Sequence, residues 1–171
     1  METKKPLPTS PLSEPHGEGR REPAAGQEAS GGDKETNDLA PRDYLLLVVD
    51  DMVDNLVIIS LNLQQQGYRV VTAANGEEAI KVAALSQPDL ILMDIGMPEL
   101  DGLEATRRIR ASEQLRTVPV IAVTAFSTDG FRRAAYDAGF EGYLVKPIDF
   151  ARLHELIRRL LPVRKAVTGD T

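Results

Sequence analysis

The sequence predicts an α/β protein with a doubly wound parallel sheet of five strands and helices on both faces. Three observations support this fold class. Short apolar runs alternate with amphipathic stretches from Tyr44 onward, the runs are apolar at nearly every position, and 42% of the 171 residues are hydrophobic. Near-continuous apolar strands are typical of parallel sheets covered on both faces. A chain of this length and apolar content is expected to form one globular domain.

The first two units each pair a strand with a helix. The run YLLLVVD at 44–50 predicts a buried strand because it is almost entirely apolar. The stretch at 55–67 predicts a helix that ends at a glycine, Gly67. The run RVVTAA at 69–74 then predicts the second strand, and the second helix is expected at 76–86.

The remaining three units repeat this alternation. Their apolar runs are DLILMD, VPVIAVTA and GYLVK, and each is followed by a stretch with helical periodicity. The last helix has one clear apolar stripe, formed by Phe150, Leu153, Ile157 and Leu160. The expected strands are 89–94, 118–125 and 142–146, and the expected helices are 102–112, 129–139 and 149–161.

Both ends of the chain differ from this pattern. Residues 1–43 hold six of the eleven prolines and five of the thirteen glycines, with few large apolar side chains. Such a segment cannot bury enough surface to offset the entropy of ordering. We therefore expect a disordered N-terminal tail, either a solubilising or linking arm or a docking segment. Residues 162–171 are expected to form a short C-terminal tail.

Composition excludes several kinds of site. The chain has no cysteine, so it can form neither a disulfide nor a thiolate metal site. Its two histidines, His16 and His154, are too far apart in sequence to indicate a metal cluster. No apolar run approaches the roughly 20 residues of a membrane span, and no signal peptide is evident. We expect a soluble cytoplasmic protein, and its net charge of -6 argues against direct nucleic-acid binding.

Polar side chains end four of the five predicted strands. Asp50 and Asp51 follow the first strand, Asp94 the third, Thr124 the fourth and Lys146 the fifth. In a doubly wound sheet, functional groups collect at the carboxyl ends of the strands. The sequence therefore predicts that these five side chains lie at one edge of the sheet.

The chemistry of these side chains suits a phosphoryl group. Converging carboxylates repel one another unless a cation neutralises them, and Mg²⁺ prefers oxygen ligands. Lys146 adds a mobile positive charge and Thr124 a hydroxyl donor, and phosphoryl transfer depends mostly on positioning and charge neutralisation. A carboxylate can itself be the nucleophile. We therefore expect Asp94 to accept a phosphoryl group.

Four motifs in order carry a resemblance to a known family. They are VVDDMVDN, LILMDIGMPELDG, VIAVTA and YLVKP. The segment 44–161 resembles the receiver domain of two-component response regulators, in particular stand-alone receivers similar to chemotaxis regulators. The resemblance implies a flavodoxin-like strand order 2-1-3-4-5 and a signalling module that is not an enzyme. Its phosphoryl group would come from a phosphohistidine on another protein.

The resemblance also implies a role for each site residue. Asp94 is the expected phosphoacceptor. Asp51 and Asp94 would ligate Mg²⁺ directly, Asp50 would act chiefly through a coordinated water, and the carbonyl of Gly96 would be a further ligand. Thr124 would contact the phosphoryl oxygens.

At the fifth strand the resemblance implies three further features. Lys146 would contact the phosphoryl oxygens, and the Lys146-Pro147 bond would be cis. Tyr143 falls at the family's switch aromatic. Its ring is expected to move inward when Thr124 turns toward the phosphoryl group, which would remodel the face of the fourth helix, fifth strand and fifth helix.

Two positions bear on how long the phosphoryl group would persist. Receivers that lose phosphate quickly tend to carry polar side chains two residues beyond the acceptor and two beyond the conserved hydroxyl. Here these positions are Gly96 and Phe126. Neither side chain can hold a water molecule in line with the phosphorus, so the resemblance implies slow hydrolysis.

The expected partners are proteins. A sensor histidine kinase or a histidine phosphotransfer protein would be the donor. An unknown target would bind the face of the fourth helix, fifth strand and fifth helix. Only ten residues follow Leu161, so we expect output by protein contact or by onward phosphoryl transfer, without nucleic acid or membrane.

Two alternatives remain open beside this interpretation. A magnesium-dependent phosphohydrolase would carry a second Asp two residues after its nucleophile on the first strand, where this chain has Met52. A degenerate receiver acting as a constitutive binding module would have lost the acceptor or the lysine. A nucleotide-binding domain is disfavoured because DDMVDN replaces the Gly-rich turn after the first strand.

Other polar residues have simpler local interpretations. Asp54 and Asn55 are expected to act at the start of the first helix, where such residues favour the exposed N–H groups. Pro98, Asp101 and Gly102 are expected to serve turn and cap geometry and not chemistry.

Overall fold

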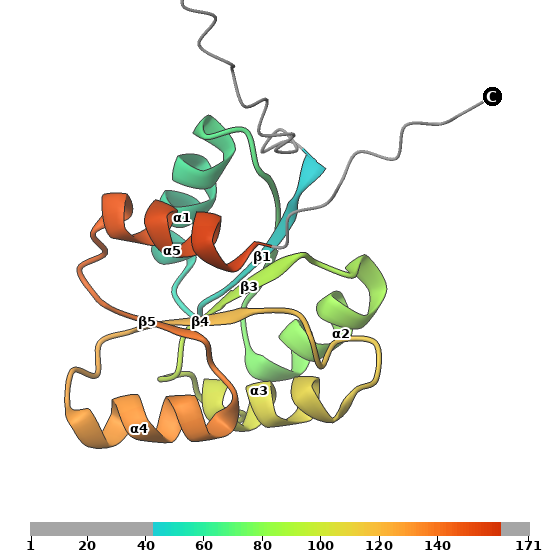
Figure 1. Cartoon of the computed structure of the whole chain (residues 1–171), viewed down its shortest axis with the longest axis vertical. Helices are drawn as coiled ribbons and strands as arrows, with labels where there is room; N and C mark the ends of the chain where they lie inside the picture. Colours follow the sequence, from blue (N-terminus) through green and yellow to red (C-terminus); the bar gives the residue numbers. More distant parts are fainter. Residues whose placement is uncertain (1–42, 162–171) are drawn as a thin grey trace, which may run out of the picture. The chain divides into compact units, whose positions relative to one another are not determined.

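The computed structural model describes residues 43–161 (Figure 1). The tails expected at 1–43 and 162–171 lie outside the described residues, apart from Asp43. Strands and helices alternate along the whole described segment, as the sequence predicts. The strands are β1 (Leu45–Val49), β2 (Arg69–Ala73), β3 (Leu90–Met93), β4 (Val120–Thr124) and β5 (Gly142–Val145). The helices are α1 (Val53–Gln65), α2 (Gly76–Ser86), α3 (Gly102–Ala111), α4 (Asp129–Ala138) and α5 (Phe150–Leu160).

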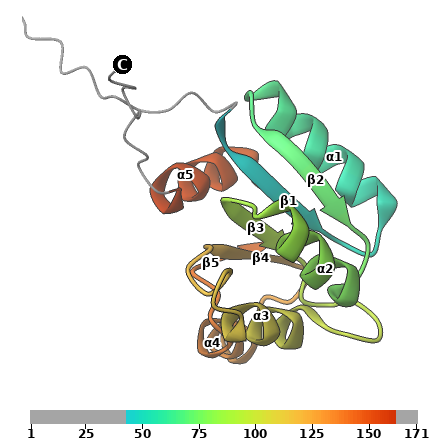
Figure 2. The ribbon, with the colours of Figure 1, turned by 90° about the vertical axis from the view of Figure 1, so that its right-hand side faces the viewer.

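The five strands form one parallel sheet in the order β2-β1-β3-β4-β5 (Figure 2). This confirms the predicted doubly wound fold and its strand order. The strand order reverses between β1 and β3, which are hydrogen-bonded neighbours with Val49 opposite Met93. In open α/β sheets a ligand site lies at such a switch point, beyond the carboxyl ends of the strands.

Helices cover both faces of the sheet. Helices α1 and α5 pack on one face, and α2, α3 and α4 pack on the other (Figure 1). Alternate residues of a strand point to opposite faces of the sheet. In β1, Leu46 and Val48 pack on the side of α1 and α5, whereas Leu47 and Val49 pack on the side of α2, α3 and α4. Burial on both faces is the physical reason why the strands are apolar at nearly every position.

The element boundaries differ slightly from the prediction. Helix α1 begins at Val53, two residues earlier than expected, with Met52 at its N-cap. The strands are shorter than expected because the polar residues after β1, β3 and β5 lie beyond the last ladder position. Helix α5 carries the predicted stripe, with Leu153 and Ile157 fully buried. None of the helices within residues 43–161 has the length and hydropathy of a membrane-spanning segment.

The turn after β3 brings α3 against the strand end. The Asp101 side chain caps α3 by accepting a hydrogen bond from the Glu104 N–H at 2.8 Å. Gly102 lies so close to the carbonyl of Asp94 that any Cβ atom there would clash with it. Both residues therefore serve turn and cap geometry, as predicted, and they fix the backbone beside Asp94.

Candidate functional site

The fold brings the predicted polar residues together at the carboxyl edge of the sheet. The Lys146 ammonium, just after β5, lies 2.6 Å from Oδ2 of Asp50 and 2.8 Å from Oδ2 of Asp94. These two aspartates follow β1 and β3, so one cation spans the carboxyl ends of the central strands. The backbone carbonyl of Thr124, the last residue of β4, accepts a hydrogen bond from the Lys146 N–H at 2.8 Å. The sheet topology thus produces the cluster expected from the sequence.

Three carboxylates face one another at this edge. Ligand oxygens of Asp50, Asp51 and Asp94 all lie within 4.8 Å of one another. Asp50 and Asp94 are buried, at 1% and 7% relative exposure, whereas Asp51 is exposed. Taking a carboxylate out of water costs several kcal/mol, so burial of two side by side requires compensating positive charge.

Asp50 is held by protein groups on both of its oxygens. Its Oδ1 accepts hydrogen bonds from the Met52 N–H at 3.0 Å and from the Asn55 side-chain amide at 2.9 Å. Its Oδ2 pairs with Lys146. Asn55 lies at the start of α1, as predicted, but its side-chain amide donates to the buried carboxylate and does not cap the helix. Asp54 lies in the first turn of α1, as predicted.

Asp94 is more open. Its Oδ1 accepts one hydrogen bond, from the Gly96 N–H at 3.0 Å, and its Oδ2 pairs with Lys146. Thr124 is fully buried, and its Oγ1 lies 3.4 Å from the Phe126 N–H, which donates to it. A carboxylate with so few hydrogen-bond donors keeps lone pairs free for a new bond.

The pKa of Lys146 reflects its two partners. Burial alone lowers the pKa of the ammonium, but the hydrogen bonds and charges of Asp50 and Asp94 outweigh burial and raise the pKa above its usual value. Lys146 therefore stays protonated across the physiological range. The Lys146-Pro147 peptide bond is cis, as the resemblance implies.

The donor set fits a hard divalent cation. Three carboxylates face one ammonium, which leaves the cluster negative by two charges. Within residues 43–161, Asp51 makes no hydrogen bond or ion pair, and its oxygens are exposed beside the buried pair. Oxygen donors with an uncompensated double negative charge are what Mg²⁺ binds. Asp50, Asp51 and Asp94 are the side chains that could hold it.

The chain is similar to known proteins of one family. A family model of the response regulator receiver domain matches residues 46–158. This chain belongs to that family. The polar-differentiation response regulator DivK of Brucella anthropi is 39% identical over 116 residues, which cover 68% of this chain and 94% of DivK.

Solved receiver structures share the fold. Chemotaxis protein CheY4 of Vibrio cholerae has a TM-score of 0.66 and 31% identity, over 69% of this chain and 98% of CheY4. The receiver domain of sensor histidine kinase PA1611 from Pseudomonas aeruginosa has a TM-score of 0.64 and 41% identity, over 68% of this chain and 96% of the PA1611 domain. That structure holds a magnesium ion in its active site cleft. The present chain is thus a signalling module of two-component systems, and its acidic cluster is consistent with a magnesium and phosphorylation site.

The receiver's Tyr143 already lies inward. Its side chain is 4% exposed, and its hydroxyl donates a hydrogen bond to the Phe126 carbonyl at 2.9 Å. The Arg132 guanidinium lies over the ring, 5.2 Å from its centroid. Burial raises the pKa of the Tyr143 phenol, although the charge of Arg132 opposes this shift. The ring is therefore buried in this structure, between the Phe126 backbone and the Arg132 side chain.

The exposed apolar surface of α1 was not among the features predicted from the sequence. Five large apolar side chains at and after the N-cap of this helix are between 49% and 67% exposed: Met52, Val53, Val57, Ile58 and Leu61. Only Ile59 and Leu63 are buried on the opposite side. A signal existed in NLVIISLNL, which contains more apolar residues than one helix face can bury. Exposed patches of this kind mark interaction sites.

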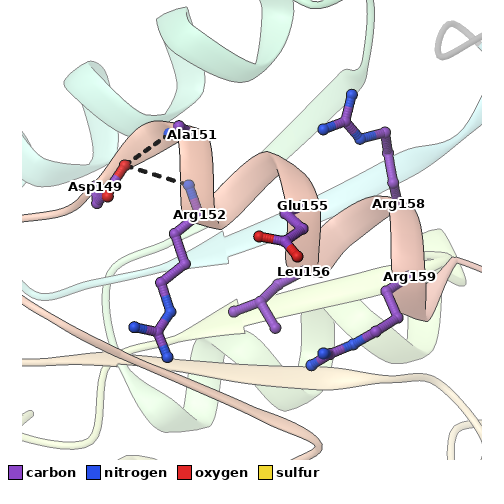
Figure 3. A pocket seen from close by; sticks show the side chains of 7 residues that line it. All are labelled: Asp149, Ala151, Arg152, Glu155, Leu156, Arg158 and Arg159. Atoms are coloured by element: carbon purple, nitrogen blue, oxygen red, sulfur yellow. Dashed lines mark hydrogen bonds between the residues drawn. The ribbon is translucent and has the colours of Figure 1, made fainter.

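A hollow lies along α5, away from the acidic cluster. It is lined by Asp149, Ala151, Arg152, Glu155, Leu156, Arg158 and Arg159. Figure 3 shows Arg152, Leu156 and Arg159 extending from the same side of the helix. None of the strand-end residues lines this hollow. It belongs to the α5 surface and not to the chemistry at the sheet edge.

Proposed function

We propose that this receiver accepts a phosphoryl group on Asp94 and signals through protein contacts. The observation that carries the proposal is the Lys146 ammonium, which bridges Asp50 and Asp94 at distances of 2.6 and 2.8 Å. It places a positive charge beside the acceptor carboxylate. Of the two aspartates, Asp94 has fewer protein donors and is therefore the better nucleophile.

The transfer step follows from this geometry. A carboxylate oxygen of Asp94 attacks the phosphorus of a phosphohistidine, the phosphorus–nitrogen bond breaks, and the electron pair leaves on the imidazole. Lys146 and the Thr124 hydroxyl would hold the equatorial oxygens of the transferred group. Lys146 can release Asp94 and follow the phosphoryl oxygens, because its side chain is flexible and Asp50 still anchors it.

Asp50, Asp51 and Asp94 would hold Mg²⁺ in this proposal. When bound, the ion supplies two positive charges that offset the excess negative charge of the site and of the incoming phosphoryl group. The Gly96 carbonyl remains a proposed further ligand. Support comes from the donor set described above.

Two surfaces are proposed for partners. The phosphoryl donor would be a sensor histidine kinase or a histidine phosphotransfer protein, docked on the exposed apolar face of α1, which starts two residues after Asp51. The output target would bind the α4, β5 and α5 face, where Tyr143 lies and where α5 carries exposed arginines. Both partners are proteins, and we place the domain in the cytoplasm, without nucleic acid or membrane contact.

Phosphate uptake from acetyl phosphate tests the proposal. Intact-protein mass spectrometry should show one added phosphoryl group on the wild type with Mg²⁺ and none with excess chelator. Asp94→Asn should take up none. Asp101→Asn is the matched control, because Asn also caps helices well and this residue lies outside the cluster. Uptake by Asp94→Asn equal to the wild type would refute the proposal.

A further inference from the structure

Two phenylalanines stack on one another close to the carboxyl end of β4. Phe126 lies in the loop after β4, and Phe131 is the third residue of α4. Their ring centroids are 4.2 Å apart with an angle of 13° between the planes. The two residues are 37% and 40% exposed, so the pair lies at the surface with part of each ring in solvent. Nothing in the transfer step described above uses Phe131.

One ring of the pair, that of Phe126, lies near the acceptor carboxylate. A Cβ atom placed on Gly96 would lie 3.2 Å from Cε2 of Phe126 and 3.9 Å from Oδ1 of Asp94. The Phe126 ring and the Asp94 Oδ1 atom therefore both lie within 4 Å of the position that a side chain at residue 96 would take. Since residue 96 is glycine, this position holds no side chain, and the nearest side chain to it is the Phe126 ring.

The backbone of Phe126 is held independently of its ring. Its carbonyl accepts the Tyr143 hydroxyl hydrogen bond at 2.9 Å, and its N–H points to the Thr124 hydroxyl oxygen at 3.4 Å. With the main chain held on both sides, the remaining freedom is the orientation of the ring. The contact that orients the exposed ring is the stack with Phe131. Stacked aromatic pairs have a preferred geometry beyond simple burial.

We propose that Phe131 is a positioning residue that holds Phe126 as an apolar cover over phosphorylated Asp94 and so slows its hydrolysis. In hydrolysis, a water oxygen bonds to phosphorus, the bond from phosphorus to the Asp94 oxygen breaks with its electron pair returning to the carboxylate, and a proton passes to solvent. That water must be held in line. An apolar ring offers it no hydrogen-bond partner. The inference rests on the proposed function, because it concerns the lifetime of the same phosphoryl group.

The test separates uptake from loss. Each variant is phosphorylated with acetyl phosphate and Mg²⁺, the donor is removed, and loss of the phosphorylated mass is followed in water enriched in oxygen-18. Phe131→Ala should lose phosphate about tenfold faster than the wild type, with uptake unchanged and the label in inorganic phosphate. Phe131→Tyr, which keeps the stack, should lose it slowly. Tyr136→Ala is the matched control, since Tyr136 is an exposed aromatic residue of α4 outside the stack.

A double variant distinguishes positioning from a general effect on α4. If Phe131 acts only through Phe126, then Phe126→Ala with Phe131→Ala should lose phosphate no faster than Phe126→Ala alone. Equal loss rates for Phe131→Ala and the wild type, or additive effects in the double variant, would overturn this inference alone. Absence of uptake by the wild type would instead overturn the proposed function and this inference together.

Discussion

The ammonium of Lys146 lies 2.8 Å from Oδ2 of Asp94, although the two residues are 52 positions apart in the chain. They follow β5 and β3, and the intervening strand of the sheet is β4. The same ammonium contacts Asp50 at 2.6 Å. One positive charge therefore serves two buried carboxylates, and we expect both the stability and the proposed chemistry of the receiver to depend on it.

Replacement of Lys146 should separate these two roles. Lys146→Ala leaves Asp50 and Asp94 buried without their positively charged partner, and loss of one member of a buried ion pair costs about 3 kcal/mol of unfolding free energy. Urea unfolding in chelator at neutral pH should show this loss. The control Lys81→Ala, at an exposed position of α2, should leave the unfolding free energy unchanged. Some phosphate uptake should remain with Mg²⁺, while coupling to the output face weakens. Unchanged stability would contradict the interpretation of the ion pair.

The Tyr143 hydroxyl should matter for the switch and not for uptake. Tyr143→Phe removes only the hydrogen bond to the Phe126 carbonyl, so acetyl phosphate uptake should stay nearly intact. Hydrogen exchange of the loop at 125–128 should become faster and target binding should change. Tyr143→Ala should do the same at a larger stability cost, about 3 kcal/mol, because it empties a buried site. A folded Tyr143→Phe protein that fails to take up phosphate would show that Tyr143 belongs to the acceptor chemistry.

Polar side chains at the two positions beside the acceptor should shorten the phosphorylated lifetime. We expect the phosphorylated wild type to decay over many minutes. The double variant Gly96→Asn with Phe126→Glu should decay about tenfold faster, which corresponds to lowering the barrier to hydrolysis by about 1.4 kcal/mol. The two residues are changed together because a Cβ at Gly96 would make a tight contact, 3.2 Å, with Cε2 of the Phe126 ring. Decay is followed after donor removal. A wild type that decays within seconds, or a double variant as slow as the wild type, would refute the prediction.

The exposed face of α1 should affect transfer from a protein donor alone. Val57→Glu with Leu61→Glu places charge on the apolar surface, so transfer from a purified phosphorylated histidine kinase that serves the wild type should slow about tenfold. Uptake from acetyl phosphate should stay the same, because that donor needs no docking surface. Leu85→Glu, at an 87% exposed position of α2, is the control. Equal slowing with both donors would point to damage at the site.

His154 should give stability a pH dependence. Burial, and then the charge of Arg158, lower the pKa of His154 in the folded state. As the pH falls, the unfolded chain takes up a proton on this histidine at a higher pH than the folded protein does. The neutral histidine's contribution to the unfolding free energy is therefore fully present above about pH 6.5 and is lost as the pH falls through the folded pKa. As the pH is lowered from about 7.5 to about 5, the wild type should lose unfolding free energy that His154→Gln does not lose, so the stability of the variant relative to the wild type should increase. A constant difference across this range would contradict the shift.

The sequence by itself determined the architecture and the strand-end chemistry. Its near-continuous apolar runs required a sheet covered on both faces, and parallel strands place their carboxyl ends at one edge. The contacts of Lys146 with Asp50 and Asp94 follow from that topology. These features were predictable because hydrophobic burial acts through residue type and periodicity, which can be read along the chain.

Only the tertiary structure decided how individual side chains are used. Asn55 braces Asp50 instead of capping α1, Tyr143 is buried beneath Arg132, and Phe131 stacks on Phe126. The apolar residues of α1 likewise divided into a buried and an exposed set only when the helix packed on the sheet. Each outcome depends on the rotation of a helix about its axis and on side-chain contacts across a loop. Those are set by packing between elements, which periodicity along the chain does not encode.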